Sequence, residues 1–338
     1  MLTRDYSFNL PEDRIAQYPS KNRGTSRLMV LNRTDGSRAH DSIKNLSGYI
    51  KPGTVLVLND TRVRKSRLYG VSETGGRVEF LLIERTGTGS WKTIVSKSKK
   101  QRPGKRYSFK GGIKGTIGTG SGGIREIRFE PAIDESYLET HGHVPLPPYI
   151  RREDTPSDSE RYQTVYSRSS GSSAAPTAGL HFTDEILEGL TRAGLEIVYV
   201  TLHVGLGTFL PIRSVRIEDH TMHEEQYEIS EESAAALANA RREGRNICAV
   251  GTTSVRTLES AWSDNGPTPG RGRTSIYIYP GYKFRAVDHM LTNFHTPESS
   301  LLLLVSAFAG WDTIKDAYEE AVELGYMFFS YGDAMLIL

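Results

Sequence analysis

The spacing of apolar residues changes twice along the chain, near residues 63 and 150, and these changes constrain the fold most strongly. Between them, short alternating runs at Arg77–Ile83, Thr93–Ser96 and Ile124–Phe129 are separated by glycine clusters, without a helical period. Short, regularly spaced strands with glycine turns are typical of a small β-barrel. Over residues 151–338, strand-like and helix-like runs alternate, which indicates an α/β fold. The 338 residues are therefore expected to form two domains.

Three predicted buried strands are each followed directly by polar residues or glycines. These apolar runs are Thr54–Leu58, Ile197–Val204 and Ile247–Val250, rich in β-branched residues. In open α/β sheets, ligands collect at the carboxyl ends of strands. The candidate site residues at these ends are Asn59, Asp60 and Arg62; His203, Gly205, Gly207 and Thr208; and Thr252, Thr253 and Ser254.

Each strand end also permits a structural interpretation. Residues 59–62 could form an Asx turn. Residues 251–254 open a helix, whose backbone N–H groups could bind an anion or simply be capped. Gly205 and Gly207 lack the third glycine and the following helix of a dinucleotide-binding loop, so a Rossmann cofactor site is not expected. Glycines could still let the backbone approach a ligand closely.

Capping signals predict four helices in the α/β part. Thr183 begins a helix that ends at Gly194, and Ser230 begins one that ends at Gly244. The other two helices are Gly251–Trp262 and Asp312–Gly325. We also expect a loop over Ser263–Arg273, a strand at Ile276–Tyr279 and a last strand at Met335–Leu338.

Six of the nine histidines lie between residues 181 and 295, and all six flank predicted loops. They are His181, His203, His220, His223, His289 and His295. Imidazole titrates near neutral pH and is the usual general acid or base. A structural role is the commoner one for any single histidine, but from the group we expect at least one to act chemically.

His220, His223 and Glu224 permit a metal-dependent hydrolase as an alternative function. Two histidines followed by a carboxylate can bind a divalent cation. The histidines are three residues apart in a loop-like setting, whereas helical metal sites usually use a spacing of four. Hydrogen bonding to a substrate or acid–base duty is therefore the stronger expectation for these residues.

Positive charge is concentrated in the predicted barrel. From Arg85 to Arg125 there are eleven lysines and arginines and no acidic residue, although the net charge of the whole chain is only +2. The aromatic residues Trp91, Tyr107 and Phe109 lie among them. Clustered cations with aromatics indicate a phosphate-backbone partner, although a solvated barrel face and a noncatalytic RNA-binding module are alternatives.

Two further features limit where the chain works. The single cysteine, Cys248, excludes an intrachain disulfide and a multi-cysteine zinc site. The N-terminal residues do not resemble a signal peptide, and the apolar run Leu301–Trp311 is too short to span a bilayer. A cytoplasmic location without a membrane partner is therefore expected.

Several long motifs resemble one known family. They are LVLNDTRV, TGGRVEFLL, ERYQTVYS, AAPTAGLHFT, TLHVGLGTF, GTTSVRTLES, YPGYKF, TNFHTPESSLLLLVSAF and FFSYGDAMLI. In this order they are similar to the S-adenosylmethionine:tRNA ribosyltransferase-isomerases of queuosine biosynthesis, over essentially the whole chain. The departures, at Ser173 and Ser300, remove no polar group from the expected site.

The resemblance implies a bacterial tRNA-modifying enzyme with a discontinuous α/β domain, residues 1–62 and 151–338, and an inserted β-barrel, residues 63–150. It implies transfer and isomerisation of the ribosyl moiety of S-adenosylmethionine onto 7-aminomethyl-7-deazaguanine in the tRNA anticodon. The products would be epoxyqueuosine-tRNA, adenine and methionine. S-Adenosylmethionine would be a cosubstrate, no metal is expected, and the protein is expected to be monomeric.

Residue roles follow as expectations from the resemblance and the local chemistry. His181 and His203 are the first candidates for general base and acid, followed by His220 and His223. The expected S-adenosylmethionine ligands are Gly205, Gly207, Thr208, Thr252, Thr253, Ser254, Asp288, Asn293, His295 and Glu298, with residues 251–254 holding the methionyl carboxylate and Asp288 or Glu298 its ammonium. The expected tRNA or deazaguanine ligands are Asn59, Asp60, Arg62, Lys97, Lys99, Lys100 and Arg102.

Overall fold

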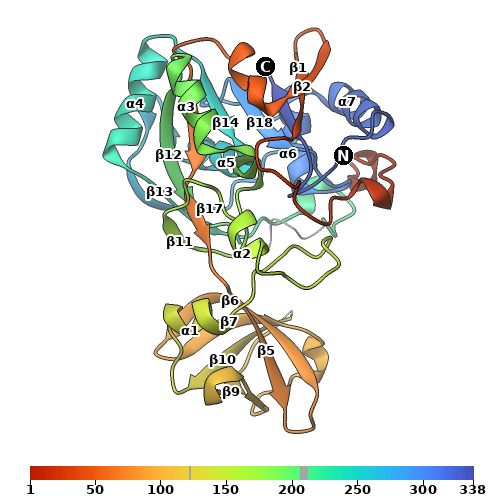
Figure 1. The fold of residues 1–338 in the computed structure, drawn as a ribbon, viewed down its shortest axis with the longest axis vertical. Helices are drawn as coiled ribbons and strands as arrows, with labels where there is room; N and C mark the ends of the chain where they lie inside the picture. The colour runs from red at the N-terminus through yellow and green to blue at the C-terminus, as the bar shows by residue number, and fades with distance from the viewer. Residues whose placement is uncertain (122, 206–211) are drawn as a thin grey trace. The chain divides into compact units, whose positions relative to one another are not determined.

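The structure is a computed structural model that describes residues 1–121, 123–205 and 212–338, and it contains two compact units (Figure 1). The first unit comprises Met1–Arg62, Pro147–Arg152 and Glu160–Leu338, and the second comprises Val63–Leu146 and Glu153–Ser159. The chain thus returns to the second unit after residue 152, beyond the expected boundary at 150. Asp154 explains this return, because it accepts hydrogen bonds from the His143 ring (2.8 Å) and the Val144 N–H (3.0 Å).

A nine-stranded mixed sheet organises the first unit. The strands β12, β3, β14 and β18 run parallel to one another, whereas β19 is antiparallel to β18 and β13 is antiparallel to β12. In spatial order the strands are β17 (Gly270–Thr274), β13 (Glu225–Ile229), β12 (Glu196–Leu202), β3 (Val55–Asn59), β14 (Ile247–Val250), β18 (His289–Asn293), β19 (Ala334–Ile337), β1 (Arg27–Leu31) and β2 (Arg38–Ser42).

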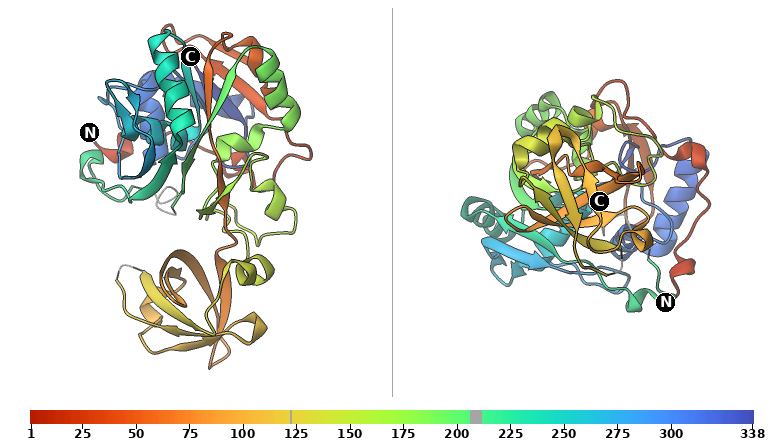
Figure 2. Two further views of the ribbon diagram at one scale, coloured as in Figure 1. Left: turned by 90° about the vertical axis from the view of Figure 1, so that its left-hand side faces the viewer. Right: turned by 90° about the horizontal axis from the view of Figure 1, so that it is seen from below.

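Helical segments cover both faces of this sheet, as the views in Figure 2 show. Successive residues of a strand point to opposite faces, so Val55 and Val57 of β3 join one apolar cluster and Leu56 and Leu58 join the other. The α-helices of the chain are α1 (Glu135–His141), α2 (Asp158–Arg161), α3 (Asp184–Arg192), α4 (Glu231–Arg242), α5 (Gly251–Ala261), α6 (Ser300–Ala309) and α7 (Trp311–Glu323). Helices α4 to α7 contribute to the first cluster, and α3 with the 3-10 helices η3 (Ile43–Gly48) and η6 (Thr177–His181) contributes to the second.

The second unit is a closed six-stranded antiparallel barrel, which confirms the predicted fold class. Its strands, in order around the barrel, are β10 (Ile124–Glu130), β7 (Ser90–Val95), β6 (Arg77–Gly87), β5 (Arg67–Ser72), β8 (Arg106–Ser108) and β9 (Lys114–Ile117). Trp91, Tyr107 and Phe109 are buried in its core. The expectation that these aromatics would accompany the basic residues at a nucleic-acid surface is therefore wrong, because their rings fill the barrel.

The local predictions succeeded where capping and apolar runs coincide. The Ser230 side chain accepts a hydrogen bond from the Ser233 N–H at the start of α4, and β14 spans the predicted Ile247–Val250. The region 263–279 was predicted wrongly. Its strands β15 (Trp262–Ser263), β16 (Gly266–Pro267) and β17 lie in or at the edge of the expected loop, and Ile276–Tyr279 is irregular. The apolar side chain of Ile278 is buried in the core without joining a ladder.

Two short strands complete the description, β4 (Thr61–Val63) and β11 (Ser169–Ser172), which pair with each other. Within the described ranges, no helix combines the length and apolar character needed to cross a membrane.

Candidate active site

The four parallel strands deliver polar residues to one edge of the large sheet. His203 follows β12, Asp60 follows β3, Gly251 follows β14, and Asn293 ends β18. Because β12, β3, β14 and β18 are neighbours with the same direction, their carboxyl ends share this edge. Two pockets lie next to the chain that follows β12. His203 lines one of them, and its neighbour Val204 lines the other.

The first pocket is a narrow slot of about 30 Å³ between η6 and the start of α5. Two of its lining side chains have a buried oxygen without a hydrogen-bond partner, Thr253 Oγ1 and Asn293 Oδ1. Buried polar atoms in native proteins are nearly always satisfied, so these two oxygens are suited to a ligand. The slot is lined by Ala175, Pro176, Thr177, Ala178, Val204, Gly251, Thr252, Thr253, Thr292, Asn293, His295 and Leu301.

His181 orients Asn293 from behind this slot. The Asn293 amide nitrogen lies 3.1 Å from His181 Nε2 and donates to the Phe329 carbonyl at 3.0 Å, and Ser26 Oγ lies 2.7 Å from His181 Nδ1. Burial lowers the pKa of His181 to about 4, so the ring is neutral at physiological pH. With both ring nitrogens engaged, His181 is placed to fix the direction of the amide and leave Oδ1 as an acceptor.

His295 is a second buried, neutral histidine at the slot. Its Nε2 lies 2.9 Å from Thr292 Oγ1, and its backbone N–H donates to the Tyr318 hydroxyl. Burial lowers the pKa of His295 to about 3. The slot is therefore bounded by a neutral imidazole and hydroxyl groups.

These two histidines predict acid sensitivity. Their pKa values are about 4 and about 3 in the folded protein, against an ordinary value of 6.5, so only the unfolded state gains protons as the pH first falls below 6.5. We expect the free energy of unfolding to decrease by about 1.4 kcal/mol per pH unit for each histidine below that pH. Urea unfolding of wild type and His181→Gln between pH 6.5 and about pH 5 measures this dependence. The variant should show a shallower pH dependence, and identical slopes would contradict the assignment.

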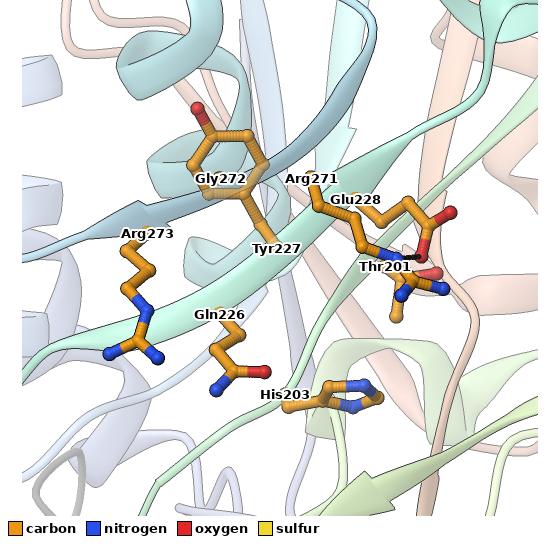
Figure 3. A pocket seen from close by; sticks show the side chains of 8 residues that line it. All are labelled: Thr201, His203, Gln226, Tyr227, Glu228, Arg271, Gly272 and Arg273. Atoms are coloured by element: carbon orange, nitrogen blue, oxygen red, sulfur yellow. Dashed lines mark hydrogen bonds and ion pairs between the residues drawn. The ribbon is translucent and has the colours of Figure 1, made fainter.

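The second pocket is open and has a volume of about 390 Å³ (Figure 3). Its lining residues come from β12, β13 and β17 and include Thr201, His203, Gln226, Tyr227, Glu228, Arg271, Gly272 and Arg273. Cross-strand partners form rows on one sheet face, because Glu228 pairs with both Thr201 and Arg271 while Gln226 pairs with Arg273. Arg271 contacts Glu228 at 3.0 Å and Arg273 contacts Glu224 at 2.6 Å, and both arginines are exposed.

His203 lies at the wall of this open pocket. Its Nδ1 is 2.8 Å from Thr61 Oγ1, and the Thr61 hydroxyl also reaches the Ser169 carbonyl oxygen at 3.4 Å. Gly171 packs on the ring so closely that an added Cβ would lie 2.9 Å from His203 Cε1. The ring is thus held by a hydroxyl partner and by close packing against the backbone.

Asp60 is beside the same pocket. Its carboxylate accepts a hydrogen bond from the Thr201 hydroxyl at 2.6 Å. Burial raises the pKa of Asp60 above its ordinary value, while the Thr201 hydrogen bond and the charge of Arg168 act in the opposite direction.

Several predicted ligands have other places in the structure. Asn59 is fully buried and bonds only to backbone: its amide donates to the Leu202 carbonyl, and its Oδ1 accepts from the N–H groups of Leu202 and Thr61. Ser254 donates to the Val250 carbonyl within its helix. Arg62 is exposed on β4, and Glu298 is partly buried with its backbone N–H bonded to the Tyr6 carbonyl. Gly207 and Thr208 lie outside the described residues.

Asp288 lies at the amino ends of β14 and β18, away from the slot, so the structure does not support its expected role with the methionyl ammonium. It precedes β18, accepts a hydrogen bond from the Ile247 N–H at the start of β14, and pairs with Arg241. The amino ends of β14 and β18 are on the side away from Asn293. The sequence alone does not show this position, because the side of the sheet on which Asp288 lies depends on the direction of β18.

The residues of the metal-site alternative do not converge. His220 packs against the Tyr277 ring, His223 is exposed, and Glu224 pairs with Arg273. In the part of the chain that the structure describes, no group of three or more His, Cys, Asp or Glu side chains could hold a metal ion.

A buried ion pair escaped the sequence analysis. Glu225, at the start of β13, contacts Arg256 of α5, and the side chains of both are only 3% exposed. The other Glu225 oxygen accepts a hydrogen bond from the Gly205 N–H at 2.8 Å. The sequence offers only the presence of charged residues, Arg256 and Glu259, within the predicted helix Gly251–Trp262 as a signal.

The basic residues Lys97, Lys99, Lys100 and Arg102 are all exposed on the barrel unit, around the 3-10 helix η4 (Ser98–Lys100).

Comparisons with known proteins agree over the whole chain. The family model described as "Queuosine biosynthesis protein" matches residues 3–337. The chain is 49% identical to an S-adenosylmethionine:tRNA ribosyltransferase-isomerase of Treponema denticola and 49% identical to one of Caldanaerobacter subterraneus subsp. tengcongensis, each over 100% of both chains. The crystal structure of S-adenosylmethionine tRNA ribosyltransferase from Thermotoga maritima matches with a TM-score of 0.58 and 36% identity, covering 99% of this chain and 100% of that one.

Proposed function

Because the chain belongs to the queuosine biosynthesis protein family, we propose that it is an enzyme that transfers and isomerises the ribosyl moiety of S-adenosylmethionine onto tRNA. The acceptor is the aminomethyl group of 7-aminomethyl-7-deazaguanine in the anticodon, and epoxyqueuosine-tRNA, adenine and methionine are the products. The alternative of a metal-dependent hydrolase is not supported, since relatives matched over their full length are named as transferases. Mass spectrometry of tRNA nucleosides after incubation with S-adenosylmethionine tests the proposal.

The observation that carries this proposal is the pair of adjacent pockets at the carboxyl edge of the sheet. A transferase with one small and one macromolecular substrate needs a confined site beside an open one. The slot offers S-adenosylmethionine two unsatisfied oxygens, Thr253 Oγ1 and Asn293 Oδ1. An amide oxygen without a partner accepts a hydrogen bond from an exocyclic amine such as that of adenine.

The open pocket suits the target base of the tRNA. Arg271 is exposed on an edge strand, and its guanidinium offers donors for phosphate or base oxygens. Gln226 and His203 lie toward the same side of the pocket in Figure 3 and offer polar groups to a base. A flipped nucleotide placed here would have its aminomethyl group near the boundary with the slot.

His203 is suited to proton transfer at this boundary. Because Nδ1 of His203 is engaged with the Thr61 hydroxyl, Nε2 is the ring nitrogen to which we assign the proton transfer. The sulfonium of S-adenosylmethionine acidifies the C5′ proton, which an unprotonated imidazole can remove. Adenine departs more readily when it receives a proton, and the attacking amine must be neutral.

The basic barrel residues predict part of the tRNA affinity. Changing Lys97, Lys99, Lys100 and Arg102 to glutamate should weaken tRNA binding by at least about tenfold and reduce the salt dependence by about 0.7 per lost phosphate contact. Filter binding over a range of salt concentrations measures both quantities. The matched control reverses four exposed basic residues of the first unit, Arg4, Lys21, Arg192 and Arg242. Equal effects of the two sets would refute a docking role for the barrel.

We further propose that the protein is a cytoplasmic monomer that needs no metal. Its substrates are both present in the cytoplasm, and each step above uses a proton carrier or an oriented hydrogen bond.

A further inference from the structure

We propose that the buried Glu225–Arg256 pair binds the α-amino acid end of S-adenosylmethionine. The guanidinium edge formed by Nε and Nη2 of Arg256 would hold the carboxylate, and Glu225 would face the ammonium. This inference rests on the proposed function, since it concerns the cosubstrate of that reaction, and it assigns a binding site to residues on two different elements, β13 and α5.

The unused donors of Arg256 are the main observation. Arg256 contacts Glu225 through Nη1, whereas Nε and Nη2 are buried and have no hydrogen-bond partner. A buried charged donor without a partner is costly. A purely structural ion pair would be expected to satisfy the remaining donors, because the surrounding fold can supply carbonyl oxygens. The Nε–Nη2 edge has the geometry that binds a carboxylate through two parallel hydrogen bonds.

The pair is linked to the slot through neighbouring residues of its lining. Gly205, whose N–H donates to Glu225, directly follows the slot residue Val204. Arg256 lies one helical turn after Thr252, which lines the slot, and residues four apart share one side of a helix. Glu225 is thus one hydrogen bond away from the chain that follows Val204, and Arg256 is one helical turn away from the slot residue Thr252.

Charge complementarity explains why a pair, and not a single arginine, would be used. The amino acid end of S-adenosylmethionine carries one carboxylate and one ammonium, and Glu225 and Arg256 present the opposite signs. The amino acid end of the ligand and the Glu225–Arg256 pair each have no net charge. Binding therefore adds no net charge to a buried region, where an unbalanced charge is costly. The start of α5 also has the positive end of its helix dipole toward this edge, which favours a carboxylate.

A decarboxylated analogue of S-adenosylmethionine tests the assignment without relying on catalysis. Titration calorimetry should show that wild type binds S-adenosylmethionine about 10- to 100-fold more tightly than the analogue, as expected for a charged bidentate contact. Arg256→Lys should lose most of this preference, because one ammonium cannot replace the bidentate edge, while its affinity for the analogue stays close to that of wild type. Arg245→Lys is the matched control, since Arg245 pairs with Glu196 and Glu243 at the other edge of the sheet.

Equal affinities of wild type for the two ligands would overturn the inference, and so would full preference in a folded Arg256→Lys variant. The wild-type comparison holds even if the variant fails to fold. Failure of the inference leaves the proposed function intact when wild type still forms ribosylated tRNA, whereas absence of both binding and product would refute the proposed function itself.

Discussion

Replacing His203 with alanine is expected to lower kcat by about 10²- to 10⁴-fold, the usual contribution of a positioned general acid or base. His203 lines the open pocket, and its ring is held in place. The Thr61 hydroxyl oxygen lies 2.8 Å from Nδ1, and Gly171 packs against the ring. The other pocket residues and the basic barrel residues remain, so tRNA affinity should fall far less than kcat. Single-turnover kinetics with saturating tRNA and S-adenosylmethionine measures the chemical step.

His220→Ala is the matched control, because His220 packs edge-on against the Tyr277 ring, is only partly exposed and lines neither pocket. Its turnover should remain near that of wild type. His181→Ala is expected to act differently from both, by loosening Asn293 and weakening S-adenosylmethionine binding. Unchanged turnover in His203→Ala would contradict the proton-transfer role.

Replacing Asn59 with alanine is expected to lower the free energy of unfolding by about 2–4 kcal/mol, since buried backbone groups left without a partner cost about 1–3 kcal/mol each. The Asn59 side chain satisfies three such groups: the N–H and carbonyl of Leu202 and the N–H of Thr61. It thereby links the end of β3 to the end of β12, directly before His203. Urea unfolding monitored by circular dichroism measures the loss.

Asn45→Ala provides the comparison, because Asn45 is exposed and its side chain donates only to the Asp41 carboxylate. Its substitution should change the free energy of unfolding by about 0.5 kcal/mol or less. An Asn59→Ala variant with wild-type stability and weakened tRNA binding would restore Asn59 as a base-reading residue and contradict the structural role.

The sequence predicted the elements whose signals are local. The Ser230 cap, the apolar run Ile247–Val250 and the glycine-separated strands of the barrel are each encoded by neighbouring residues, and each forms as expected. Strand β17 has the sequence GRGRT, without apolar alternation, and it is a strand only because its backbone pairs with β13. Tertiary pairing of this kind has no local signature.

The site was predictable only as far as the carboxyl ends of strands. Asn59 ends β3 and Asp60 directly follows it, yet the Asn59 side chain is buried and links two strands, whereas Asp60 bonds to Thr201 of the open pocket. Asp288 has the same local chemistry as a ligand but lies at the amino end of β18. Glu225 and Arg256 are 31 residues apart in the sequence and meet only in the folded chain. Which of these carboxylates can face a ligand depends on strand order and direction.

The most direct test is the product of a reaction with S-adenosylmethionine and tRNA that carries 7-aminomethyl-7-deazaguanine. Mass spectrometry of the digested tRNA and of the small molecules should show epoxyqueuosine together with free adenine and methionine. Methylated tRNA together with S-adenosylhomocysteine would contradict the account, because the cosubstrate would then donate its methyl group and keep its ribosyl moiety.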